Sequence, residues 1–181
     1  LCISVVAEPE IQSNGNQNET DVKIDEKGNV FVAPLWYHIS SDSTAEVIRY
    51  YSYKKLKSVV IPSEIQTAEG VFPVTSIGEG AFRGCSGLTN IEFPKSLTSI
   101  GDGAFSGCIG LMNVILPLSV TSIGEGAFSG CSGLTNIEFP KSLTSIGASA
   151  FSGCVGLTFI KIPSGVTNIE PRTFAGSGLK S

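Results

Sequence analysis

The chain has 181 residues, of which 41% are hydrophobic and 15% are charged, and its formal net charge is −4. This charge argues against a nucleic-acid-binding surface, which normally carries a basic stripe. No run of about 18 apolar residues occurs, so the sequence predicts no membrane-spanning segment.

Residues 1–20 are predicted to be a signal remnant followed by a flexible lead. Residues 1–7 (LCISVVA) are apolar and end in small side chains, as the tail of an export signal does, although a short buried strand fits the same letters. Leu1-Cys2 is also compatible with the end of a lipoprotein box. Residues 8–20 are rich in Asn, Gln, Gly and Glu, a composition typical of a tether. Because the first residue is Leu rather than Met, we expect a fragment or a processed product.

Residues 21–55 are predicted to form an N-terminal cap of antiparallel β-hairpins. Polar turns at 25–29 and 40–44 separate short apolar segments, which is the pattern of strand, turn and strand. A solenoid needs an atypical end unit over its first hydrophobic layer, and these segments hold the only Trp and all four Tyr. The alternative is that the aromatic and basic residues 50–55 form a surface that stacks on bases or sugars. His38 has no second His with which to share a metal ion, so we expect a structural role.

Residues 56–181 repeat at a step of 23 residues, which predicts about five stacked units. The stretch 121–147 copies 75–101 with a single substitution. The first unit carries a nine-residue insertion with a turn at Glu69-Gly70, which indicates a small projecting hairpin. The last unit is predicted to be truncated. One aromatic position recurs at Phe82, Phe105, Phe128, Phe151 and Phe174.

Each unit is predicted to contain one short strand and one irregular or short-helical return. In LTNIEFP, apolar Ile137 alternates with polar Asn136 and Glu138, which is the period of a strand with one buried face. The proline that follows ends the strand because it cannot donate to a ladder. In the return, Ala150 and Phe151 are expected to lie inside.

Four cysteines recur at the same step, and we expect a buried, reduced ladder. No C-x-x-C pair is present to indicate a metal site. Adjacent coils would bring their Cα atoms within a disulfide's reach, but side chains stacked in register point in parallel. Cysteines in such a ladder behave as small buried hydrophobes. The sequence therefore predicts neither a metal nor a cofactor. The four positions are Cys85, Cys108, Cys131 and Cys154.

The unit LxxIxIPxSVTSIGxxAFxxC resembles the leucine-rich repeats of the BspA-like, or Treponema pallidum, type. Residues 88–94 are similar to the strand segment of that family, and residues 99–101 and 104–108 are similar to its return segment. The N-terminal hairpins and the lengthened first repeat are similar to the arrangement in many exported Bacteroides-type members.

The resemblance implies a leucine-rich-repeat solenoid with a parallel β-sheet on its concave side, preceded by an antiparallel β-hairpin cap. Phe93 and Phe139 stand where the family usually has Ile, and Ser177 stands where it has Cys. These departures concern packing. Family members are mostly cell-surface or secreted proteins associated with adhesion to host proteins or other cells. The resemblance thus implies an exported protein, and it brings no catalytic residues with it.

We expect a non-enzymatic binding module with a protein partner, such as a host extracellular-matrix or cell-surface protein. Its binding surface would be the outward strand positions of the concave face. Ile115 and Phe159 are the most informative of these positions, because they are apolar where water is expected. The alternative is that these positions are only soluble strand residues. The candidate binding residues are Asn90, Glu92, Asn113, Ile115, Asn136, Glu138, Phe159 and Lys161.

Two other function classes compete with the binding module. A structural spacer or self-associating surface element would use the same repeats, with open sheet edges pairing between molecules. An enzyme would need a catalytic pair, and Glu92 and Glu138 do share a face. They lie two coils apart, roughly 10 Å by strand spacing, which is wide even for an inverting glycosidase. No enzymatic activity is therefore expected.

Overall fold

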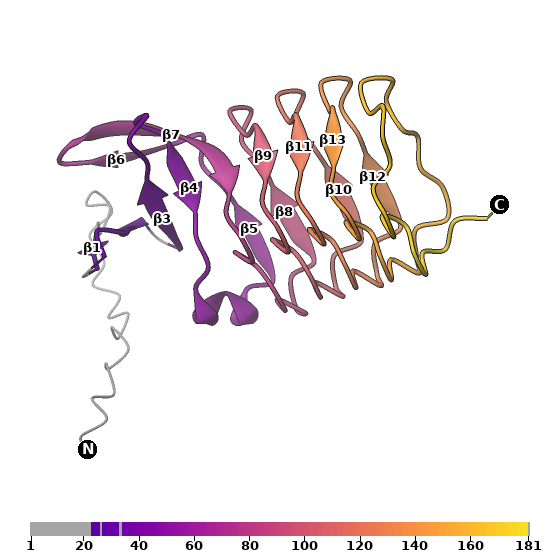
Figure 1. The fold of residues 1–181 in the computed structure, drawn as a ribbon. Coiled ribbons are helices and arrows are strands. Elements are labelled where there is room, and N and C mark those ends of the chain that lie inside the picture. Colours follow the sequence, from indigo (N-terminus) through magenta and orange to yellow (C-terminus); the bar gives the residue numbers. More distant parts are fainter. Residues whose placement is uncertain (1–22, 26, 33, 181) are drawn as a thin grey trace, which may run out of the picture.

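The computed structural model describes residues 23–25, 27–32 and 34–180. The predictions for residues 1–20 lie outside this part of the chain. Figure 1 shows a row of similar coils that continues from a set of β-hairpins, so the predicted leucine-rich-repeat solenoid is confirmed.

The N-terminal hairpins form because polar turns separate short apolar strands. Strands β1 (Lys23–Ile24), β2 (Val30–Val32), β3 (Leu35–Ile39) and β4 (Ala45–Val47) pair antiparallel in chain order. The carboxylate of Asp25 accepts hydrogen bonds from the backbone N–H groups of both Lys27 and Asn29, which closes the first turn. These are the antiparallel hairpins that the sequence predicts.

The insertion in the first unit is also a hairpin. Strand β6 (Glu64–Thr67) pairs antiparallel with β7 (Gly70–Ile77), and Thr67 lies opposite Gly70. Ala68 and Glu69 therefore form the turn, one residue earlier than the predicted Glu69-Gly70. The hairpin projects beyond the coils in Figure 1.

The outward strands of the coils pair in parallel, and each residue lies opposite the equivalent residue of the neighbouring coil. Strand β5 (Ser58–Val60) pairs with β8 (Asn90–Glu92), and β10 (Asn113–Ile115) pairs with β12 (Asn136–Glu138). Residues 158–162 of the last coil form no strand. The short 3₁₀ helix η1 (Tyr51–Lys55) precedes β5 and is the only helix among the described residues.

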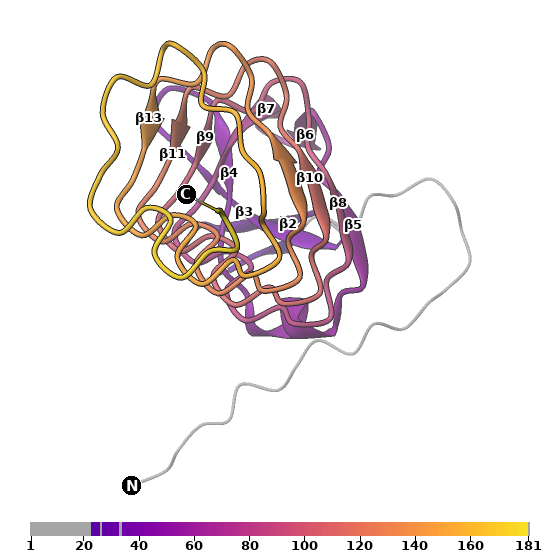
Figure 2. The same ribbon diagram turned by 90° about the vertical axis from the view of Figure 1, so that its right-hand side faces the viewer.

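Three of the returns contain a second short strand that the sequence does not predict, whereas residues 166–170 of the last return form none. Strands β9 (Ser99–Ile100), β11 (Ser122–Ile123) and β13 (Ser145–Ile146) pair in parallel. They continue through β7 to β4, so one sheet joins the hairpins to the coils. Figure 2 shows this ladder and the β5, β8 and β10 strands on opposite sides of the coil. The rest of each return consists of turns and loops.

A column of phenylalanine rings fills the interior. Phe82 and Phe105 stack with ring centroids 5.2 Å apart and planes 3° apart, and the same step repeats to Phe174. Tyr53, which the sequence analysis assigns to the cap, stacks on Phe82 at 5.2 Å. The column therefore holds six stacked rings, one more than the sequence period shows.

Backbone packing between coils is tight enough to require glycine at some positions. A Cβ atom added at Gly147 would lie 2.5 Å from the backbone nitrogen of Glu125 in the preceding coil. Real Cβ atoms essentially never approach so closely, so neighbouring returns touch through bare backbone.

Candidate functional site: the outward strand face

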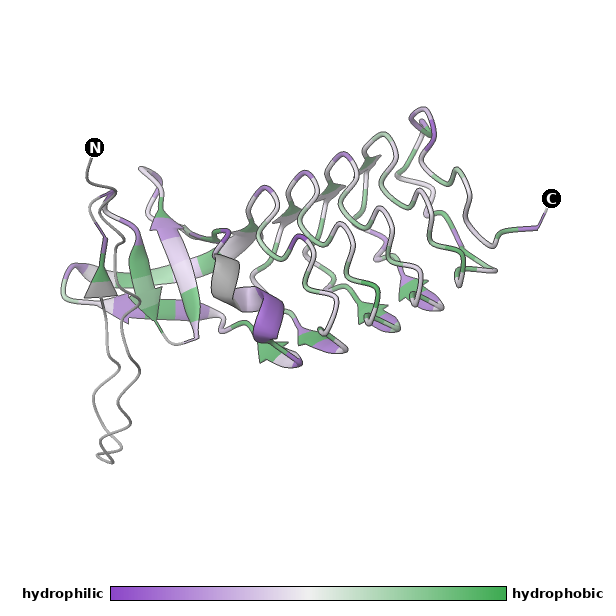
Figure 3. Ribbon diagram, turned by 90° about the horizontal axis from the view of Figure 1, so that it is seen from below, coloured by the Kyte–Doolittle hydropathy of each residue, from purple (hydrophilic) through white to green (hydrophobic). Residues whose placement is uncertain are grey.

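The candidate binding residues lie where the strand period predicts. In β8, β10 and β12 the central residue is buried and the two outer residues are exposed. Figure 3 colours these strands by hydropathy: hydrophilic and hydrophobic residues alternate in β8 and β12, whereas β10 ends in two hydrophobic residues. We call the exposed side of β5, β8, β10, β12 and residues 158–162 the strand face.

Asparagine side chains run across the coils in one row of the strand face. Asn113 lies opposite Asn136 in the parallel register, and Ser58 lies opposite Asn90. The Nδ2 atom of Asn136 donates to Oδ1 of Asn113 at 2.8 Å, and the Nδ2 atom of Asn90 donates to Oγ of Ser58 at 3.4 Å. These amides therefore stabilise one another along the ladder, which is a structural role that needs no partner.

The neighbouring row mixes charged and apolar side chains. Glu138 lies opposite Ile115 in the register of β10 and β12, and Glu92 lies opposite Val60. The Ile115 side chain is 66% exposed, although large aliphatic side chains in strands usually face the core. No salt bridge joins Glu92 or Glu138 to any other described residue.

Phe159 and Lys161 come from the last coil rather than from a paired strand. Phe159 is 77% exposed, and Lys161 is also exposed. The structure thus brings six of the eight predicted residues together on regular strands and supplies the other two from the adjoining coil.

Several exposed apolar side chains next to this face were not predicted. They show up when each coil is compared with its neighbour one repeat away, where serine, threonine or lysine occupies the same position. The unpredicted residues lie before or after the strands, where no alternation indicates exposure. They are Ile109, Leu118 and Val155. Met112 is also exposed, and it begins the stretch Met112–Leu116, which differs between the copies and is therefore an expected place for binding.

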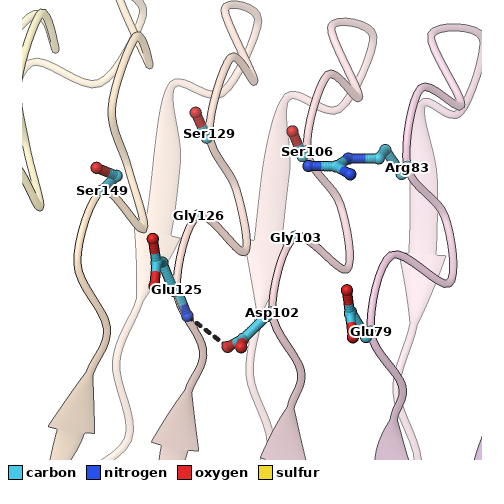
Figure 4. A pocket seen from close by; sticks show the side chains of 9 residues that line it. All are labelled: Glu79, Arg83, Asp102, Gly103, Ser106, Glu125, Gly126, Ser129 and Ser149. Carbon is cyan, nitrogen blue, oxygen red and sulfur yellow. Dashed lines mark hydrogen bonds between the residues drawn. The ribbon is translucent and has the colours of Figure 1, made fainter.

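A shallow groove on the returns is a second candidate site, and it is lined chiefly by acidic and small residues (Figure 4). Glu79, Asp102 and Glu125 come from successive coils, and Arg83 lies beside them. Oδ1 of Asp102 accepts a hydrogen bond from the backbone N–H of Glu125 at 2.7 Å. No group of His, Cys, Asp or Glu in the described part of the chain is arranged to hold a metal ion.

The predicted cysteine ladder is buried, and each thiol beyond the first contacts the previous coil. The Sγ atom of Cys131 donates to the carbonyl oxygen of Phe105 at 3.1 Å, and Cys108 and Cys154 make the equivalent bond. Burial raises the pKa of Cys85 and of Cys154 to about 11. A nucleophilic cysteine needs a lowered pKa, so these thiols are packing groups rather than candidate catalytic residues.

Comparisons with known proteins agree on one kind of repeat. A family model described as a BspA-type leucine-rich repeat region matches residues 47–180 in six copies. The six copies agree with the six stacked rings. No curated protein is significantly similar to the chain. Among the described residues, no helix is long and apolar enough to cross a membrane.

Solved structures of other leucine-rich repeat proteins are similar to this chain. The Treponema pallidum leucine-rich repeat protein TpLRR has 28% sequence identity and a TM-score of 0.64, over 78% of this chain and 75% of that chain. A leucine-rich repeat protein from Bacteroides ovatus has 28% identity and a TM-score of 0.54, over 74% of this chain and 41% of that chain.

Proposed function

Because the chain belongs to the BspA-type leucine-rich repeat family, we propose that it is a non-enzymatic binding module, exported to the cell surface or secreted. It binds a protein partner, such as an extracellular-matrix or host cell-surface protein, through the strand face. Export is supported by the apolar start of the sequence and by the family resemblance.

The observation that carries this proposal is the exposure of two large apolar side chains on the strand face, one at the end of β10 and one in the last coil. Ile115 is 66% exposed and Phe159 is 77% exposed. An exposed aromatic ring gains more free energy on burial than most side chains, and aromatic residues are enriched at the energetic centres of protein interfaces. Asn136 and Glu138 beside them are suited to a polar rim.

The architecture suits binding because the surface is formed before the partner arrives. The strand face is held by the aromatic column and by backbone hydrogen bonds between coils, so binding orders few residues. Association through this face therefore costs less conformational entropy than binding through a flexible loop of this chain would. Solenoids commonly present extended surfaces of this kind.

The experiment compares two variants on a panel of immobilised extracellular-matrix proteins and mucin glycans. The double variant Ile115→Glu/Phe159→Glu places charges on the strand face. The matched control Val71→Glu changes an exposed valine on the projecting hairpin, which is 51% exposed. Circular dichroism should show both variants folded, because all three positions are exposed.

We expect the parent and the control to bind at least one protein of the panel, and the double variant to lose at least about tenfold in affinity. Equal binding by the double variant and the control would remove the strand face from consideration. Binding to glycans alone would contradict a protein partner.

A further inference from the structure

One coil carries exposed apolar side chains at the strand face and in the segments directly before and after it. Ile109 and Met112 precede β10, Ile115 is the last residue of β10, and Leu118 lies in the loop that follows. These side chains therefore form a line along a single coil, at right angles to the row of coils. We call it the apolar lane, and it consists of Ile109 (53% exposed), Met112 (61%), Ile115 (66%) and Leu118 (82%).

The coils on the two sides of the apolar lane are near-identical copies of each other and are polar at the same four positions. Level by level, both flanks carry serine beside Ile109, threonine beside Met112, glutamate beside Ile115 and lysine beside Leu118. All of these flanking side chains are exposed. The charged ones are Glu92 and Glu138 at one level, and Lys95 and Lys141 at the next.

These charges have no partner within the described part of the molecule. None of the four forms a salt bridge with another described residue, although both signs lie on the same coils. Each flank thus offers one free carboxylate and one free ammonium group beside the two most exposed side chains of the apolar lane, Ile115 and Leu118. An exposed apolar line with a charged rim on both sides is the usual make-up of an interaction surface.

We propose that a second copy of this chain covers the end of the apolar lane that holds Ile115 and Leu118. The two copies are related by a two-fold axis that runs along the solenoid and passes between the levels of Ile115 and Leu118. This inference rests on the proposed binding face and names its occupant. Ile115 of each copy then packs on Leu118 of the other.

The charge pattern favours this occupant and this orientation. A two-fold rotation about the solenoid axis keeps each coil opposite itself and reverses the strand direction, so the two charged levels change places. Glu92 then meets Lys95 of the second copy, and Glu138 meets Lys141. A two-fold axis along the strands would instead place Glu92 against Glu138, and like charges in contact disfavour association. The surface is therefore complementary to itself in one orientation.

The size of the contact indicates a weak dimer. Each copy contributes six side chains, three at the level of Ile115 and three at the level of Leu118. Such a contact buries less than the roughly 1,200 Å² of surface that separates transient from stable complexes. We therefore expect a monomer–dimer equilibrium that depends on concentration. Because the charge pairs lie at the rim, added salt should shift it toward monomer.

The test is sedimentation equilibrium of the purified protein with paired charge reversals. Glu92→Lys/Glu138→Lys places lysine against lysine, and Lys95→Glu/Lys141→Glu places glutamate against glutamate. Each pair should weaken the dimer about tenfold or more. All four substitutions together restore opposite charges, and they should recover the parent dissociation constant to within about threefold.

The matched control is Glu79→Lys/Glu125→Lys, which makes the same change of net charge in the groove on the returns. This control should leave the equilibrium within about twofold of the parent, because Glu79 and Glu125 are exposed away from the apolar lane. Thermal melts verify folding, since charge substitutions at exposed positions change stability little.

Recovery of the dimer in the fourfold variant supports the proposal. A protein that stays monomeric up to millimolar concentration overturns it, and so does a dimer that neither reversal weakens. Both results leave the proposed binding function standing if Ile115→Glu/Phe159→Glu still loses affinity for a panel protein. Conversely, a dimer with the expected charge dependence and no panel binding would support self-association and contradict the proposed binding of a foreign protein.

Discussion

The aromatic column is built differently where the repeats meet the N-terminal hairpins. Within the repeats, consecutive rings have planes within 13° of each other. Beyond Tyr53 the contacts continue to Tyr50 and Trp36 with planes 62° and 42° apart. The repeats pack identical apolar rings, whereas the first coil uses rings with polar ends, and Oη of Tyr53 accepts a hydrogen bond from the backbone N–H of Trp36. A further repeat therefore lengthens the aromatic column with one more apolar ring. The N-terminal end of the column instead uses a side chain that also forms a hydrogen bond with the backbone.

The largest expected effect breaks the column in its regular part. Phe128 is fully buried between two stacked rings, so Phe128→Ala should lower the free energy of unfolding by about 3–5 kcal/mol. Phe174 at the other end is only half-buried, and Phe174→Ala should cost less. Urea denaturation followed by circular dichroism measures both. Equal losses would contradict the dependence of the cost on how deeply each ring is buried.

A second prediction contrasts the glycines of the two regions. Gly147→Asn puts a side chain against the backbone of the preceding coil and should cost about 1–3 kcal/mol. Gly28 in the first hairpin turn has φ +79° and open space around its Cα, so Gly28→Asn should change stability little. Urea denaturation of the two variants compares them directly. A costly Gly28→Asn with a tolerated Gly147→Asn would contradict the close contact between returns.

The thiols predict a loss of stability at alkaline pH. Burial raises the pKa of Cys85 to about 11 and that of Cys108 to about 12, from an ordinary value of 9.0. Between the unfolded and folded values the unfolded chain has released protons that the folded chain keeps. The free energy of unfolding is therefore unaffected below about pH 9 and then falls, by about 1.4 kcal/mol per pH unit for each thiol.

The measurement for this prediction is urea denaturation of the parent and of Cys108→Ala between about pH 8 and about pH 12. The parent should lose stability with the steeper slope, because the variant lacks one ionising thiol. Cys85→Ala serves as the matched variant beside the cap. There Lys54 and Arg49 partly oppose the effect of burial on the pKa, so its influence on the slope should end at a lower pH. Parallel slopes in all three proteins would contradict the prediction.

The smallest expected effect separates two buried tyrosines of the N-terminal region. Tyr53→Phe removes the acceptor of the Trp36 N–H and should cost about 0.5–1.5 kcal/mol. The hydroxyl of Tyr37 is buried and has no hydrogen-bond partner in the described structure, so Tyr37→Phe should be neutral or slightly stabilising. Thermal melts of the two variants measure the difference. A larger loss for Tyr37→Phe would show that a water molecule satisfies that hydroxyl.

The sequence predicts the coil because identical letters recur at a fixed step and the outward strands alternate with period two. The second ladder escapes prediction because two residues, such as Ser122 and Ile123, are too few to show alternation. The place of Tyr53 in the aromatic column is not predicted, because Tyr53 lies 29 residues before Phe82 and the repeat has a step of 23 residues. For the site, exposure of Ile115 follows from its strand position. Leu118 lies in a loop, where no periodicity indicates which way a side chain points.

The hydrogen bonds between coils have a mechanical consequence. Those of Ser96, Thr98 and Cys108 each span 22 to 26 residues, so a coil is held by its immediate neighbours. If the chain is pulled from its ends, the unfolding of one 23-residue coil lengthens the molecule by roughly 75 Å. This gain is the length of the extended coil less the spacing that the folded coil occupies in the stack. We therefore expect the molecule to lengthen under tension in equal steps, because the coils unfold one at a time. Optical tweezers would record these steps, and a single rupture of the whole stack would contradict them.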